Sequence, residues 1–135
     1  MKTDFLKTKP LTENELATII VNICFEIHTT IGPGCLESVY EEILCYELTQ
    51  LGIEFERQKG VPVIWKDIKM DIGFRSDVIV MNKVIVDLKS VEKVAPVHSK
   101  ILLTYLKLTG IKLGLLINFG EHLIKDGISR VVNKL

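Results

Sequence analysis

With 135 residues, 47% of them apolar and 25% charged, the chain has the composition of one globular domain rather than of a disordered protein. The net charge is zero, divided into −7 over residues 1–56 and +7 over residues 57–135. This division allows a basic face, although the two halves can equally mix on one surface, so strong sequence-independent nucleic-acid binding is not predicted from charge alone. No apolar run could span a membrane, and residues 1–10 lack a signal-peptide core. We therefore expect a single cytoplasmic domain over residues 1–135, with no membrane partner.

Two helices are predicted before any strand. Thr12 followed by Glu15 is a capping-box pattern, and apolar residues recur at helical spacing over residues 16–31. Gly32-Pro33-Gly34 should end this helix, because glycine suits the left-handed cap and proline cannot continue a helix. A second amphipathic helix is predicted from about Cys35 to Gly52.

The rest of the chain predicts several strands and a third helix, which begins at Pro96 and ends at Gly110. The expected strands are residues 53–57, 61–65, 71–80, 84–89, 113–119 and a weaker one over 122–132, with breaks at Gly60 and Asp126-Gly127 and a turn at Lys66-Asp67. This order predicts an α/β (α+β mixed) fold, with a central mixed β-sheet flanked by helices.

The sharpest functional signal is a pair of acids in an apolar hairpin. Asp77 and Asp87 lie at its two outer ends. Lys89 shares a strand face with Asp87, because side chains two residues apart project together. The strand from Val84 to Leu88 is almost continuously apolar, which is typical of a strand buried on both faces. Ionised groups rarely occupy such a strand unless they are paired or bind a metal.

The turn of this hairpin decides whether the two acids meet. With a two-residue loop, Asn82-Lys83, Asp77 would lie opposite Leu88, and the acids would point to opposite faces. With a three-residue loop, Met81-Asn82-Lys83, Asp77 lies opposite Asp87 and their β-carbons are about 5 Å apart. The absence of glycine disfavours the tight two-residue turn, so we favour the three-residue loop.

Two facing carboxylates suit Mg²⁺, which takes hard oxygen ligands and keeps water positions open. Lys89 could orient such a water or neutralise charge on a phosphate. Glu37, in the first turn of the second helix and on the same side as Tyr40, offers a third acid, although acids favour helix N-termini for electrostatic reasons alone. An Asp-x-Lys tripeptide also arises by composition in roughly one chain in every few. Only the conjunction of these residues indicates a site.

The segment Gly34-Cys35-Leu36-Glu37-Ser38-Val39-Tyr40 resembles the Gly-x-x-Glu-x-x-Tyr signature of the GxxExxY protein family, which is grouped with the PD-(D/E)XK nuclease superfamily. The similarity runs from about Ile31 to Asn118 and includes Phe74-Arg75-Ser76-Asp77, Asp87-Leu88-Lys89, His98 with Tyr105-Leu106-Lys107, and Gly114 to Phe119. The resemblance implies a restriction-endonuclease-like core. It also implies that Glu37, Asp77 and Asp87 bind metal and that Lys89 is the catalytic lysine.

One position departs from the related nucleases. They often carry Gln-x-x-x-Tyr on the helix after the acid-x-Lys strand, whereas here the residue four before Tyr105 is Ile101. His98 and Tyr105, together with Arg75 and Tyr40, are candidate contacts to the substrate or supports of the acids. The alternative for His98 and Tyr105 is a helix-end histidine and a half-buried core tyrosine.

Two functions are consistent with the sequence. The first is a Mg²⁺-dependent nuclease, with Mn²⁺ as an alternative ion and with DNA or RNA as the partner. The second is a catalytically inactive nucleic-acid-binding or assembly module that keeps the nuclease fold, which Ile101 and the zero net charge favour. Assembly into a homo-oligomer stays open under both hypotheses.

Overall fold

The computed structural model describes residues 10–135, apart from the side chains of Val61, Asp71, Ile72 and Phe74, so the first nine residues of the expected domain lie outside it. The described chain forms, in order, α2 (Glu13–Ile31), α3 (Glu37–Gln50), β1 (Phe55–Trp65), β2 (Ile68–Val80), β3 (Val84–Lys89), α4 (Val97–Thr109), β4 (Leu113–Asn118), a 3₁₀ turn η1 (Ile124–Gly127) and β5 (Ile128–Val132). Five strands make one sheet in the order β1-β2-β3-β4-β5. Only the β3–β4 pair is parallel, so the sheet is mixed.

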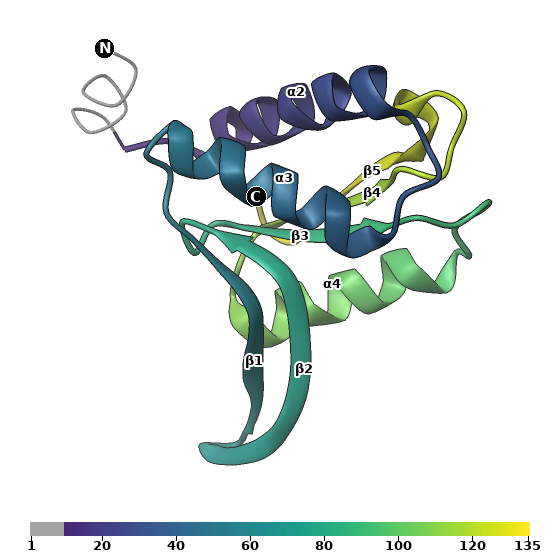
Figure 1. Cartoon of the computed structure of the whole chain (residues 1–135). Coiled ribbons are helices and arrows are strands. Elements are labelled where there is room, and N and C mark those ends of the chain that lie inside the picture. Colours follow the sequence, from purple (N-terminus) through teal and green to yellow (C-terminus); the bar gives the residue numbers. More distant parts are fainter. Residues whose placement is uncertain (1–9) are drawn as a thin grey trace.

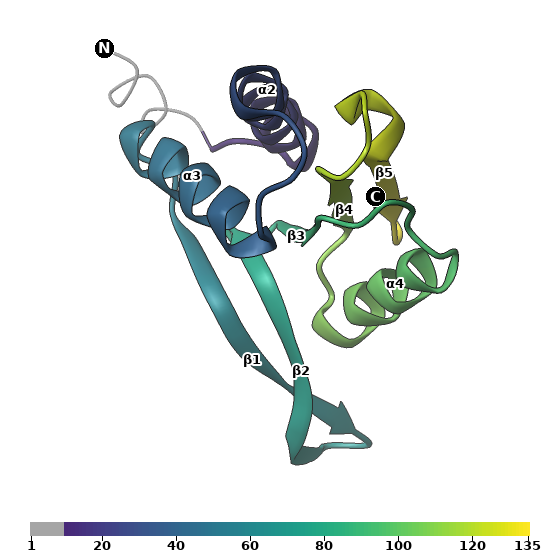
Figure 2. The ribbon, with the colours of Figure 1, turned by 45° about the vertical axis from the view of Figure 1, so that its right-hand side comes forward.

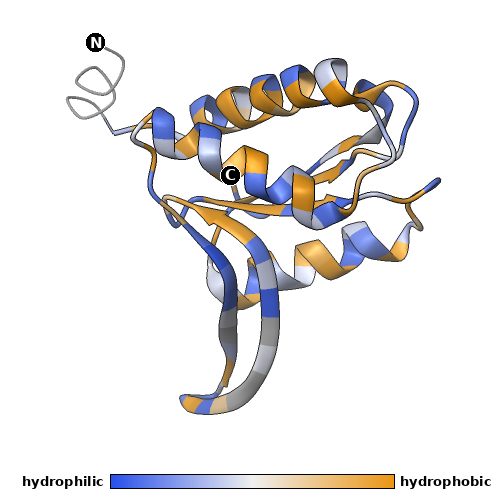
Figure 3. Cartoon of the chain, viewed as in Figure 1, coloured by the Kyte–Doolittle hydropathy of each residue, from blue (hydrophilic) through white to orange (hydrophobic). Residues whose placement is uncertain are grey.

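Helices cover both faces of this sheet, as predicted. Figures 1 and 2 show α2 and α3 on one side of β3 and α4 on the other. The crossover through α4 is what allows β3 and β4 to run in parallel, because parallel neighbours need a long connection. Side chains divide accordingly: Val78 and Val86 pack toward α2 and α3, whereas Ile79 and Ile85 pack with α4. Figure 3 shows the apolar colouring concentrated where these layers meet.

The first helix begins and ends where the sequence predicts. The Thr12 hydroxyl accepts a hydrogen bond from the Glu15 amide at 3.1 Å, and the Glu15 carboxylate accepts one from the Thr12 amide at 3.0 Å, which completes the capping box. Gly32 ends the helix with a φ of 71°, a conformation that glycine adopts without steric cost. The second helix starts at Glu37, two residues later than expected.

The hairpin register confirms the three-residue loop. Val80 pairs with Val84 and Val78 pairs with Val86. The three residues between the strands, Met81-Asn82-Lys83, therefore form the turn. Met81 and Asn82 take φ angles of 48° and 55°, so the turn forms in the left-handed region without any glycine. Continuing the register by one residue places Asp77 opposite Asp87.

The strands differ from the sequence expectations in three places. Gly60 does not break a strand: β1 is continuous from Phe55 to Trp65. It pairs with β2, which begins at Ile68 rather than near residue 71, and the register of the pair shifts between Pro62 and Val63. The ladder to β2 outweighs the entropic cost of one glycine, and a side chain at Gly60 would meet nothing. The weak strand expected over residues 122–132 is a strand only from Ile128 to Val132; the expected break at Asp126-Gly127 is confirmed and belongs to η1.

The end of β4 is held by the fully buried side chain of Asn118. Its Oδ1 accepts hydrogen bonds from the amides of Val91 and Gly120, both at 3.0 Å, and its Nδ2 donates to the Val91 carbonyl at 2.9 Å. One amide group therefore fixes the connection that leaves β3. Among residues 10–135, no helix is long and apolar enough to cross a bilayer.

Asn118→Ala should lower the free energy of unfolding by about 2–4 kcal/mol, because it leaves three partly buried backbone groups without partners and opens a cavity. Urea unfolding followed by circular dichroism measures this loss. Asn22→Ala, at an exposed position of α2, is the matched control and should change stability by less than about 0.5 kcal/mol. Equal unfolding midpoints for the two variants would contradict the role of Asn118 as the anchor of this connection.

Candidate active site

Asp77 is positioned by the place where β2 leaves β3. The paired residues of these two strands end at Val78 and Val86. Beyond that point the amide of Leu88 has no strand neighbour on that side, and the Asp77 carboxylate takes its hydrogen bond at 2.9 Å. A buried backbone amide needs such an acceptor, so one oxygen of Asp77 is fixed by the backbone of β3.

Asp87 and Lys89 project from β3 on the face that packs against α4. The Lys89 Nζ lies 3.4 Å from Asp87 Oδ1, and the two side chains are 23% and 19% exposed. Their separation of two residues on one strand produces this pairing, as the sequence predicts.

Asp77, Asp87 and Lys89 line one cavity of about 250 Å³. Strands β2 and β3 form its floor and one side, and α4 forms the opposite wall through His98, Ile101 and Tyr105. The full lining is Arg75, Ser76, Asp77, Ile85, Val86, Asp87, Lys89, His98, Ile101 and Tyr105. Six of these residues are the candidates from the sequence, and a seventh, Ile101, is the position that differs from the related nucleases. All seven therefore line the same cavity.

The carboxyl group of Asp87 is electrostatically unusual. Burial is the main cause that raises its pKa, from 3.8 to about 6, and the neighbouring Asp77 carboxylate raises it further. The Lys89 ammonium opposes both effects but does not cancel them. A second cation beside the two acids would lower this pKa, so the arrangement is suited to a positively charged ligand.

Glu37 and Tyr40 do not line the cavity. Glu37 is exposed in the first turn of α3, on the other side of the sheet from α4. Tyr40 is fully buried: its hydroxyl donates to the Gly32 carbonyl at 2.7 Å and accepts from the Cys35 amide at 3.1 Å, and its ring stacks on Phe119. In the part of the chain that is described, no three His, Cys, Asp or Glu side chains form a group that could hold a metal. The structure thus brings together two acids and the lysine.

The start of α3 is nevertheless tied to the end of β3. Ser90, the residue after Lys89, donates a hydrogen bond from its hydroxyl to the Cys35 carbonyl at 2.7 Å. Cys35 lies two residues before Glu37. The helix end that carries the third acid is therefore attached next to the strand of Asp87 and Lys89, although Glu37 itself does not line the cavity.

Sequence reasoning missed a polar network behind Asp77. Glu41, buried on α3, accepts hydrogen bonds from Arg57 at 2.9 and 3.1 Å and from Gln58 Nε2 at 2.8 Å. The same Gln58 nitrogen lies 3.3 Å from Asp77 Oδ1. Gln58 takes a φ of 48°, which an ordinary residue adopts only at a cost. The one signal in the sequence was the acid next to Tyr40 on the core side of α3.

Ser76 carries a second unusual group. Its side chain is buried and its hydroxyl oxygen has no hydrogen-bond partner among the described residues. An unpaired buried hydroxyl costs about 1–3 kcal/mol, so it is uncommon away from functional sites.

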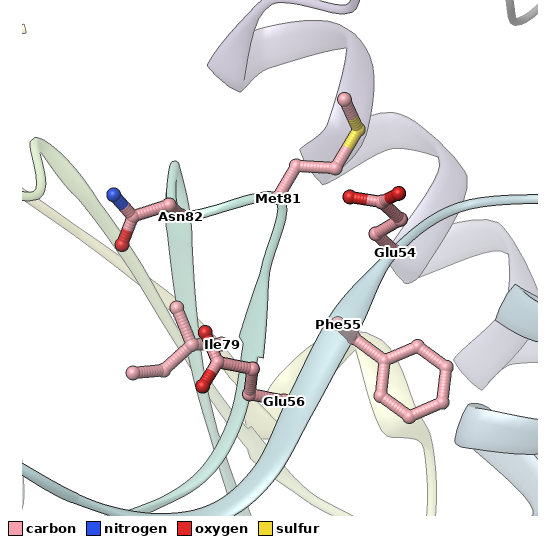
Figure 4. A pocket seen from close by; sticks show the side chains of 6 residues that line it. All are labelled: Glu54, Phe55, Glu56, Ile79, Met81 and Asn82. Atoms are coloured by element: carbon pink, nitrogen blue, oxygen red, sulfur yellow. The ribbon is translucent and has the colours of Figure 1, made fainter.

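A larger cavity, of about 520 Å³, lies at the other end of the hairpin and lacks this chemistry. It is lined by Glu54, Phe55, Glu56, Ile79, Met81 and Asn82. Figure 4 shows the carboxylates of Glu54 and Glu56 well apart. None of these six lining residues is basic, so the smaller cavity around Asp87 is the better candidate.

The sequence profile of the PD-(D/E)XK nuclease superfamily matches residues 14–131. The chain belongs to the PD-(D/E)XK nuclease superfamily. The match includes every strand of the sheet except the last residue of β5, and the mixed sheet flanked by helices is consistent with the restriction-endonuclease-like fold. No characterised protein and no solved structure matches the chain significantly.

PD-(D/E)XK nucleases generally depend on a divalent metal. The donor set of this cavity fits such an ion: two facing carboxylates, one with a raised pKa, open into a space that has room for water and a phosphate.

The raised pKa of Asp87 predicts how stability depends on pH. Because the folded protein holds this proton more tightly than the unfolded chain, the contribution of Asp87 to stability increases as pH falls from about 7 to about 4. Asp87→Asn mimics the protonated form, so without metal at pH 7–8 it should be as stable as the wild type or more stable, by on the order of 2 kcal/mol. Thermal melts in EDTA at pH 5 and pH 8 measure both effects.

Asp126→Asn, at an exposed position of η1, is the control and should keep the wild-type pH response. If Asp87 instead serves mainly as the ion-pair partner of Lys89, its neutralisation leaves a charge unpaired. A destabilised Asp87→Asn at pH 8 would therefore show that the ion pair with Lys89, and not the cost of burying the carboxylate, dominates at this position.

Proposed function

We propose that this protein is a Mg²⁺-dependent nuclease that hydrolyses phosphodiester bonds in nucleic acid, and that Mn²⁺ can replace Mg²⁺. The observation that carries the proposal is the convergence of Asp77, Asp87 and Lys89 in one cavity walled by α4. The finer assignment to the GxxExxY family and a cytoplasmic location are part of this proposal. They rest on the Gly34-to-Tyr40 segment and on the composition of the chain.

Asp77 and Asp87 would hold the metal ion. Mg²⁺ needs only one or two carboxylates when waters and substrate phosphate oxygens complete its coordination, so two acids are a sufficient set. When bound, such an ion supplies charge stabilisation at the phosphate and lowers the pKa of a bound water. We include Glu37 as a proposed third ligand, because the Ser90–Cys35 hydrogen bond attaches its helix end beside β3.

The protein's own groups have distinct tasks in this scheme. The Leu88 amide holds Asp77 with one oxygen fixed, so that little reorganisation is needed at the moment of reaction. Lys89 donates hydrogen bonds to the attacking water or to the phosphate oxygen on which negative charge develops. Asp87 must lose its proton to bind a cation, so activity should fall below about pH 6.

The cavity wall supplies contacts to the substrate. Arg75 is held by a 2.8 Å hydrogen bond from its Nη1 to the Gln58 carbonyl, and it keeps further donors for a phosphate. His98 and Tyr105 line the α4 side. Ile101 lies between them on the helix, so an apolar side chain occupies the position where relatives carry glutamine.

Lys89→Ala should lower metal-dependent cleavage by about 100-fold or more and leave the affinity for metal nearly unchanged, because Lys89 acts on the water and the transition state. The measurement is cleavage of mixed single- and double-stranded DNA and RNA with Mg²⁺ or Mn²⁺, against EDTA. Lys112→Ala, at an exposed site before β4, is the control and should cleave like the wild type. Undiminished cleavage by Lys89→Ala would place the activity elsewhere.

Metal binding should also be visible without any substrate. An ion that binds only the folded state stabilises it by about 2.7 kcal/mol at a hundred times Kd, which raises the melting temperature by several degrees. Asp87→Asn should abolish most of this increase, and Glu37→Gln tests the third ligand in the same melts. A wild type indifferent to millimolar Mg²⁺ and Mn²⁺ would refute the metal site.

A further inference from the structure

Beyond the cavity, β1 and β2 continue together as a two-stranded arm that comprises residues 59–75. Figures 1 and 2 show it projecting away from the helices and the rest of the sheet. The strands stay paired to the tip, where Trp65 lies opposite Ile68 across a turn at Lys66 and Asp67. An arm of this length adds little to the core, so its surface is available for another role.

One face of the arm's tip is entirely apolar. Cross-strand partners project to the same face, so the pairs Val63–Met70 and Trp65–Ile68 form one patch. Trp65 and Ile68 are each 61% exposed, and Met70 is 41% exposed. A large exposed apolar patch on a protruding element marks an interaction site. The patch has no partner within the described chain.

The charge of the arm indicates which class of molecule binds to the patch. The sequence of the arm has a net charge of +2, and α4, on the same side of the sheet, adds Lys100 and Lys107 with no acid. The Lys66 Nζ lies 5.7 Å from the centre of the Trp65 ring, so a cation and an aromatic face are presented together. Aromatic faces that stack on bases, beside lysines that bind phosphates, are the usual means of holding unpaired nucleic acid. Nucleic acid carries a negative charge on every phosphate, whereas a second copy of this chain has a net charge of zero, so the charge of the arm favours nucleic acid.

The arm is also continuous with the strand that carries Asp77. Strand β2 runs without interruption from Ile68 at the tip to Asp77 in the cavity, nine residues or at most about 30 Å along the strand. Stacked nucleotides rise about 3.4 Å each, so this length spans about nine of them. Arg75, at the base of the arm, lines the cavity itself. Alternation along the paired strands places Trp65 and Ile68 on the face of the arm opposite to Asp77, so a nucleic-acid strand that contacts the tip and the acids at once passes over an edge of the two-stranded arm.

We propose that the arm binds unpaired nucleotides of the substrate about nine nucleotides from the bond that is cut. Bases stack on Trp65 and its apolar neighbours, and Lys66 and Lys69 bind the adjacent phosphates. The inference rests on the proposed nuclease function and narrows its substrate to nucleic acid with exposed bases, because a continuous duplex hides the base faces that an apolar patch recognises.

The intrinsic fluorescence of Trp65, the one tryptophan in the sequence, reports the contact directly. In EDTA, where no cleavage occurs, a 24-nucleotide single strand of DNA or RNA should quench this fluorescence, and a blunt 24-base-pair duplex should quench it much less. Binding of the single strand without any change in Trp65 emission would overturn the proposal.

Variants test the energetics by fluorescence anisotropy in the same buffer. Trp65→Ala should weaken binding of the 24-mer about tenfold or more, and the double variant Lys66→Glu with Lys69→Glu should reduce the salt dependence of log Kd by about 1.4. The controls are Tyr46→Ala on α3, an aromatic that is also 61% exposed, and Lys112→Glu with Lys125→Glu. Equal affinities for the arm variants and their controls would exclude the arm as the binding element.

The two proposals fail separately. Quenching of Trp65 by single strands without Mg²⁺-dependent cleavage would support the arm and refute the nuclease. Cleavage of 24-mers that Trp65→Ala leaves unchanged would support the nuclease and refute the arm. If Trp65→Ala converts a dimer into a monomer in light scattering, the patch is a contact between two copies, and the arm proposal is overturned.

Discussion

The hydrogen bond from the Leu88 amide to Asp77 depends on the feature that shapes the whole molecule, the divergence of β2 from β3 on the N-terminal side of Val78 and beyond Val86. While the two strands run together, their backbones satisfy each other and valines fill the core. Where they separate, an amide of a buried strand needs a new acceptor, and an aspartate provides it. The same divergence opens the cavity between β2 and α4, and it sends β2 outward into the arm. The position of Asp77, the cavity and the arm therefore all follow from the separation of these two strands.

Under the proposed function, metal binding and stability make opposite demands on Asp87. Burial on β3 raises the carboxyl pKa to about 6, and only part of that effect is offset by Lys89 at 3.4 Å. A protein selected for stability alone would place an apolar residue there. An acid that is poorly solvated and faces another acid gains most from a cation, so the arrangement that destabilises the fold is the one that favours a ligand of opposite charge.

Much of the fold follows from local patterns in the sequence. The capping box at Thr12 and the glycine after α2 act within a few residues, and strand alternation with the glycine-free turn at Met81 was enough to set the register that brings Asp77 and Asp87 together. The network through Glu41 and Gln58 was not foreseeable, because it requires a helix residue and a strand residue, 17 positions apart, to meet behind Asp77. The continuity of β1 across Gly60 escaped prediction for a similar reason: the strand depends on its partner rather than on its own residues.

The parallel pairing of β3 with β4 has a consequence for the order in which parts of the chain fold. Hairpin β1–β2 joins neighbouring segments and can form early, as can the turn between β2 and β3. Asp87, by contrast, pairs with the β4 position at Leu116, and the intervening chain must first fold as α4 and return across the sheet. Such non-local contacts form slowly. The wall that carries His98 and Tyr105 is therefore among the last parts in place, and a partly folded or freshly synthesised chain holds the acids without the enclosure in which they could act.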